Sequence, residues 1–146
     1  MSKLLIIFIS AFLFISCQEN KTENNLNVEP LEISQAWMRP GVENRNTAAF
    51  MTIKNNTGYD DTLFSVSSEA AKVVELHETF TRENDLKGMR HVELIVIPSN
   101  SSVELKPGSF HVMLIGLNKN FRKGEKGEIK LAFKNNDTVS LTTEVK

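Results

Sequence analysis

The stretch "SFHVMLIGL", residues 109–117, predicts a β-strand, because apolar and β-branched residues fill a short run that Gly116 closes. Side chains two residues apart on a strand point to the same face. His111 and Met113 therefore share one face, and the residues that alternate with them share the other. Two interpretations fit this pair: ordinary core packing with one satisfied histidine, or a metal site that uses an imidazole beside a thioether.

Comparable short apolar runs fill the chain from Pro30 onward. Turn signals such as Pro40-Gly41 and Pro107-Gly108 separate them. Runs at this spacing predict an all-β domain, and we expect a Greek-key β-sandwich of about eight strands. Only residues 68–71 resemble a helical turn. The expected strands lie at 31–39, 47–55, 62–68, 72–80, 89–97, 103–105, 109–117, 127–135 and 138–146.

The N-terminus has the pattern of an export signal. An uncharged apolar run at residues 4–16 follows Lys3 and ends at Cys17, the one cysteine of the chain. The run is too short for a resident transmembrane helix but suits the apolar part of a signal peptide. Because the small Ser16 precedes the cysteine, the segment resembles a bacterial lipoprotein signal. An uncleaved anchor or an ordinary signal with an incidental cysteine is the alternative.

We therefore predict a signal peptide at 1–16, lipidation of Cys17, a polar tether at 17–30 and a folded domain at 31–146. The tether is rich in Asn and Glu and lacks an apolar period, so it cannot bury enough surface to order itself. The protein is expected in the cell envelope, anchored by lipid and facing the periplasm. Gln18 after the cysteine favours the outer membrane by analogy with familiar lipoproteins.

The composition argues against several classes of function. Lys and Arg number 17 against 18 Asp and Glu, and no basic run suggests a nucleic-acid partner. With Cys17 used for lipid, the domain has no thiol for redox chemistry, nucleophilic catalysis or metal ligation. Asp60-Asp61 lies in a turn, where Asp favours local backbone hydrogen bonds. No nucleophile elbow is present, so we predict that the protein is not an enzyme, although a triad dispersed in sequence is possible.

The histidines and methionines offer a more specific pattern. His77 lies near the end of the expected strand 72–80, and Met89 follows Gly88 near another strand end. Both could therefore meet His111 and Met113 at one end of the sandwich, near the surface. Thioether sulfur is soft and selects Cu(I), and the lack of a cysteine ligand excludes a blue-copper electron-transfer centre.

The spacing resembles the signature of the PCu(A)C family of periplasmic copper chaperones, which is close to H-(M)-x10-M-x21-H-x-M. Here His77 and Glu78 are followed by ten residues, Met89, twenty-one residues and "HVM" at 111–113. The similarity extends over residues 33–145 and includes "AWMRP" (36–40), "AAFMTIKN" (48–55) and "VELKPG" (103–108). It implies a cupredoxin-like β-sandwich that binds one Cu(I) ion through the metal ligands His77, Met89, His111 and Met113.

The resemblance also implies a client, either the copper-centre subunit of cytochrome oxidase or another copper carrier. Two other functions stay open: copper sequestration for tolerance, and a metal-free interaction module on a lipid tether. Glu78 replaces the optional Met of the signature and is expected to face away from His77. We expect Met51 in the core and His91 in an exposed or structural role, and Met38 could flank the site.

Overall fold

Ten β-strands supply nearly all the regular structure of the computed structural model, which describes residues 29–146. A single 3-10 turn, η1 (Glu83–Asp85), interrupts them within this range. The strands are β1 (Leu31–Met38), β2 (Thr47–Asn55), β3 (Asp61–Ser67), β4 (Ala71–Thr81), β5 (Lys87–His91), β6 (Ile95–Ile97), β7 (Ser101–Leu105), β8 (Phe110–Leu117), β9 (Lys126–Phe133) and β10 (Val139–Val145).

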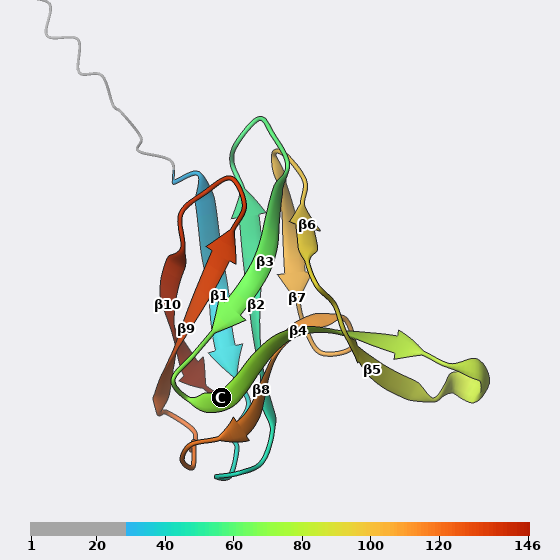
Figure 1. Cartoon of the computed structure of the whole chain (residues 1–146), viewed down its shortest axis with the longest axis vertical. Helices are drawn as coiled ribbons and strands as arrows, with labels where there is room; N and C mark the ends of the chain where they lie inside the picture. The colour runs from blue at the N-terminus through green and yellow to red at the C-terminus, as the bar shows by residue number, and fades with distance from the viewer. Residues whose placement is uncertain (1–28) are drawn as a thin grey trace, which may run out of the picture.

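The strands form one hydrogen-bonded sheet that folds over on itself as a sandwich (Figure 1). Its order is β5-β4-β8-β2-β1-β10-β9-β3-β6, and β7 pairs separately with β2. The layers join where β1 meets β10 in a short parallel pairing, Trp37 with Glu144 and Met38 with Val145. The second layer, β10-β9-β3-β6, covers the first, so apolar side chains from both fill the space between them.

The core follows the alternation that the sequence predicts. In β9 exposed and buried residues alternate, with Ile129, Leu131 and Phe133 directed inward. β2 is buried along most of its length because it pairs with β1 on one side and with β7 and β8 on the other. Burying each large aliphatic side chain contributes about 1.5–3 kcal/mol, so this shared core holds the strands in register.

The predicted all-β sandwich is confirmed, with ten strands instead of about eight. The expected strand 89–97 is two strands, because β5 pairs with β4 whereas β6 pairs with β3 in the other layer. Residues 92–94 carry the chain across. The helical turn expected at 68–71 was wrong: the hydroxyl of Ser68 accepts a hydrogen bond from the N–H of Ala70 at 3.1 Å and closes a turn between β3 and β4.

The β4–β5 hairpin projects from the sandwich (Figure 1). β4 pairs with β8 from Ala71 to Glu78, and its outer half pairs with β5 from His77 to Thr81. In the hairpin, a Cβ on Gly88 would lie 2.8 Å from Cζ of Phe80, so a larger residue at this position would force the Phe80 ring to shift. Because β5 pairs with β4 alone, residues 79–91 are joined to the sandwich only at the base of the hairpin.

Among residues 29–146 no helix has the length and apolar character needed to cross a bilayer. The predicted signal peptide, the lipidation site Cys17 and the tether up to residue 28 lie outside the described residues, and they stay predictions.

Candidate metal centre

Strand pairing places the two predicted ligands of β8 on the same face as His77. β4 and β8 are antiparallel, with His77 opposite His111 and Glu75 opposite Met113. Residues directly opposite each other in antiparallel strands point to the same side of the sheet. His111 and Met113 therefore share a face with Glu75 and His77, as the period of two in each strand also requires.

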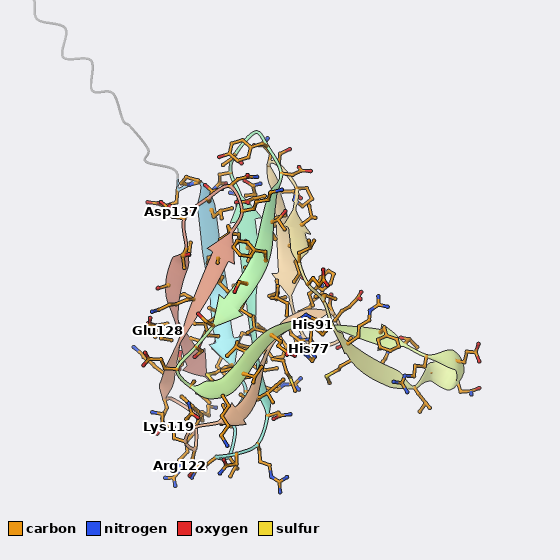
Figure 2. All side chains as sticks on the ribbon, in the orientation of Figure 1. His77, His91, Lys119, Arg122, Glu128 and Asp137 are labelled. Atoms are coloured by element: carbon orange, nitrogen blue, oxygen red, sulfur yellow. The ribbon has the colours of Figure 1, made fainter. Side chains whose placement is uncertain are left out.

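The pairing of β4 with β5 extends this face outward. His77 lies opposite His91, and Thr79 lies opposite Met89. Figure 2 shows His77 and His91 together where the hairpin leaves the sandwich. All four residues predicted as ligands thus project from one face of three adjacent strands.

A groove of about 390 Å³ opens on this face. It extends between His111, which is only 3 % exposed, and Met89 in the hairpin, which is 58 % exposed. The His77 and His111 rings lie 5.9 Å apart between centroids. The residues that line the groove are Arg39, Pro40, Asn46, Thr47, Ala48, Phe50, Thr79, Lys87, Met89, Pro107, Gly108, His111 and Met113.

A backbone hydrogen bond sets the tautomer of His111. Its Nδ1 lies 2.9 Å from the carbonyl oxygen of Ser109, and a carbonyl can only accept, so Nδ1 carries the proton. The other ring nitrogen, Nε2, keeps its lone pair. Burial lowers the pKa of His111, and electrostatic repulsion by the His77 and Arg39 side chains lowers it further, which outweighs the opposite effect of the Ser109 hydrogen bond. The ring is therefore neutral at pH 7, the form that binds metals.

His77 has the complementary arrangement. Its Nε2 lies 2.9 Å from Oε2 of Glu75, and since a carboxylate only accepts, Nε2 donates the proton. In the neutral ring Nδ1 then holds the lone pair, yet this nitrogen is buried and has no hydrogen-bond partner within the described part of the chain. A buried polar atom without a partner calls for an explanation. A carboxylate that hydrogen-bonds the far nitrogen of a histidine is the usual support of a metal-binding ring.

On the opposite face of β8 and β4, core side chains hold the two strands that carry His77, His111 and Met113. Val112, Leu114 and Leu76 are buried in the core. On the site's own face, the Phe50 ring lies 6.3 Å from the ring of His111, and the Arg39 guanidinium stacks over Phe50 at 5.2 Å. Packed aromatic and aliphatic neighbours thus hold the buried end of the groove, whereas its Met89 end is open.

Several other side chains singled out in the sequence lie away from the groove. Met38 and Met51 are both buried in the core, which excludes Met38 as a side chain that flanks the surface of the site. Glu78 binds Arg90 through Nη2 at 2.6 Å on the face opposite His77. Asp61 is buried and accepts hydrogen bonds from the N–H groups of Thr62 and Asn135.

Sequence reasoning missed the cluster around His77. The carboxylate of Glu75, Nε2 of His77 and the ring of His91 place their potential ligand atoms within 4.8 Å of one another. His91 is exposed, as expected, but its Nδ1 lies only 3.8 Å from Oε2 of Glu75. The period of two already put Glu75 beside His77 and His91 beside Met89. The pairing of β4 with β5, which brings His91 beside His77, could not be predicted from the sequence.

Comparison with known proteins assigns the chain to a family. Residues 31–145 match the family described as "Putative lipoprotein LpqE-like". A relative from Leifsonia xyli, named "Putative lipoprotein Lxx21020", is 32 % identical over 117 residues, which are 80 % of this chain and 69 % of that protein. The chain belongs to the LpqE-like family. A second relative, "Uncharacterized protein RP573" of Rickettsia prowazekii, is 25 % identical over 136 residues, 90 % of this chain and 75 % of that protein.

Solved structures place the LpqE-like fold with PCuAC domains. The copper-bound PCuAC domain from PmoF2 superimposes with a TM-score of 0.66 at 23 % identity, covering 80 % of this chain and 92 % of that domain. The solution structure of CuI-DR1885 from Deinococcus radiodurans gives a TM-score of 0.62 at 26 % identity, covering 83 % of each chain. The cupredoxin-like sandwich that the sequence predicted is therefore confirmed, and the protein is a PCuAC-like member of a lipoprotein family.

Proposed function

We propose that this protein is a copper chaperone of the cell envelope that carries one Cu(I) ion on His77, Met89, His111 and Met113. The observation that carries the proposal is the pair of complementary histidine tautomers. Each ring donates one N–H to a fixed acceptor, Glu75 for His77 and the Ser109 carbonyl for His111, and keeps one lone pair. For His77 that lone pair is on the buried nitrogen that has no other partner.

The donor set matches the chemistry of monovalent copper. Two neutral imidazoles and two thioethers are soft to borderline ligands, which favour Cu(I) over zinc, calcium or magnesium. The similarity to CuI-DR1885, whose structure contains Cu(I), supports the same metal here. Because the first shell has no charge, the ion keeps its positive charge, and we expect transferable binding instead of permanent burial.

The exposed position of Met89 would make this proposed ligand the easiest one for a recipient protein to replace. Met89 projects from the hairpin and is more than half exposed, whereas His111 is buried beneath the groove. A recipient protein can therefore approach the ion from the hairpin and replace Met89 first. Lipidation of Cys17 would confine this exchange to a membrane surface, where the copper-centre subunit of cytochrome oxidase or another copper carrier could accept the ion.

Copper titration tests the proposal. The full chain with Cys17→Ser, solubilised in detergent so that no thiol competes, is titrated with Cu(I) under anaerobic reducing conditions against a chromophoric chelator. We expect one bound equivalent and a clear loss of affinity in Met113→Leu, a near-isosteric change that removes the sulfur. Met51→Leu is the matched control, because that thioether lies in the core. Equal losses in the two variants, or no Cu(I) binding at all, would contradict the proposal.

A cellular experiment separates delivery from sequestration. If the protein delivers copper, deleting its gene lowers cytochrome oxidase activity at limiting copper, and added copper restores the activity. If it sequesters copper, deletion leaves the oxidase active and makes the cells sensitive to excess copper.

A further inference from the structure

A second group of metal-binding side chains lies beside the proposed Cu(I) site and shares one residue with it. It consists of Glu75 and His77 of β4 and His91 of β5. The Cu(I) ligands predicted from the sequence include neither Glu75 nor His91. We propose that these three side chains form a separate site for a divalent transition-metal ion, with Cu(II) as the preferred occupant.

The distances permit one ion to reach all three ligands. An ion that binds imidazole nitrogen and carboxylate oxygen at about 2.0–2.2 Å brings neighbouring ligand atoms to roughly 3–3.5 Å from each other. Glu75 Oε2 is 2.9 Å from His77 Nε2 and 3.8 Å from His91 Nδ1. Only His91 has to move inward, and its side chain is 55 % exposed at the end of β5, so it is free to do so.

The donor types select a harder ion than the groove does. One carboxylate and two imidazoles, without sulfur, suit divalent ions of borderline softness, and among these Cu(II) binds most strongly in the Irving–Williams order. The carboxylate also offsets part of the charge of a divalent ion. The thioethers and the carboxylate are thus segregated: both thioethers line the groove, whereas Glu75, His77 and His91 lie outside its lining.

His77 connects the two sites through its opposite ring nitrogens. The divalent site uses Nε2, which requires the ring proton to lie on Nδ1. The Cu(I) site uses the lone pair of Nδ1, which requires the proton on Nε2. A neutral imidazole cannot meet both conditions, so the two ions exclude each other. This mutual exclusion, unlike the divalent site itself, rests on the proposed function.

Cu(II) titration of the full chain with Cys17→Ser in detergent, followed by electron paramagnetic resonance, tests the divalent site. We expect one equivalent with a tetragonal signal and hyperfine structure from two imidazole nitrogens. His91→Ala should weaken Cu(II) binding by about tenfold or more and leave Cu(I) affinity unchanged. Glu93→Gln, which alters a nearby exposed carboxylate outside the cluster, is the control. Unchanged Cu(II) affinity in His91→Ala overturns the proposal.

The same protein distinguishes failure of this site from failure of the proposed function. Met113→Leu should weaken Cu(I) binding and preserve the Cu(II) signal. If it leaves Cu(I) affinity unchanged while His91→Ala abolishes the Cu(II) signal, the Cu(I) assignment fails and the divalent site stands. One equivalent of Ag(I), a soft ion that is not redox-active here, should displace Cu(II). Simultaneous binding of both ions would overturn the sharing of His77.

Discussion

Replacing Glu75 by Gln removes one negative charge that lies 2.9 Å from Nε2 of His77 and preserves the shape of the side chain. Gln can still accept the hydrogen bond through its amide oxygen, so the tautomer of His77 is maintained. The variant therefore measures the electrostatic effect of the carboxylate on copper bound to the opposite ring nitrogen.

The size of that effect follows from the geometry. With copper on Nδ1 of His77, the carboxylate and the ion would lie about 7 Å apart, which gives about 2.4 kcal/mol at an effective dielectric constant of about 20 and about 0.6 kcal/mol in bulk water. The Glu75 side chain is 35 % exposed, so the value lies between these limits. We expect Cu(I) affinity to fall about tenfold, within the range typical of residues that support a metal ligand.

The assay is chelator competition for Cu(I), with Glu78→Gln as the matched control. Glu78 is three residues further along β4, faces the opposite side of the sheet and pairs with Arg90. Replacing Glu78 removes an equal charge, but from the face of the sheet opposite His77. Cu(I) affinity should therefore change by less than about twofold, as for exposed ion pairs. Equal losses in both variants, or an unchanged affinity in Glu75→Gln, would refute the role of Glu75.

Three further predictions follow from the geometry. Met89→Leu should speed release of Cu(I) in stopped-flow chelator transfer more than Met113→Leu does, since Met89 is the more exposed of the two proposed thioether ligands; equal rates would contradict this. Leu114→Ala should lower the free energy of unfolding in urea by about 2–5 kcal/mol, because a fully buried side chain leaves a cavity; a cost below about 1 kcal/mol would contradict the core assignment. Burial opposes ionisation of Asp61, but hydrogen bonds from Asn136 and neighbouring backbone groups hold its pKa below the ordinary 3.8. Its stabilising contribution is complete above that value and is lost as pH falls through the lower folded-state pKa, so Asp61→Asn should flatten the loss of stability on acidification below about pH 4; an unchanged acid profile would count against it.

The sequence was sufficient for the fold class because turn signals separate its short apolar runs, and in strands such as β9 buried and exposed residues alternate. The period of two placed His111 with Met113 and placed Val112 and Leu114 in the core, as the burial of these residues bears out. It was insufficient at residues 89–97, where one apolar run supplies two strands to different layers. Apolar patterning fixes which side of a strand is buried, but it does not identify the strand's partner.

The same limit applies to the site. Spacing and family resemblance pointed to His77 and Met89, and strand register brings them to the face that carries His111. Glu75 and His91 lacked significance in the sequence because a charged residue and an exposed histidine are common on a solvated strand. Their relation to His77 follows from a tertiary pairing, and its consequence for the ring tautomer follows from a single hydrogen bond.

Because the β4–β5 hairpin projects from the sandwich, a bound ion could dissociate without unfolding of the domain. Phe80 and Thr81 pair only with Gly88 and Lys87, and η1 at the hairpin tip has no buried side chain, so the hairpin can open while the sandwich stays folded. Opening withdraws Met89 and His91 together, whereas His111 stays packed in place. A partner that binds the hairpin could therefore set the rate of metal exchange, and faster amide hydrogen exchange in residues 79–91 than in β8 would be its signature.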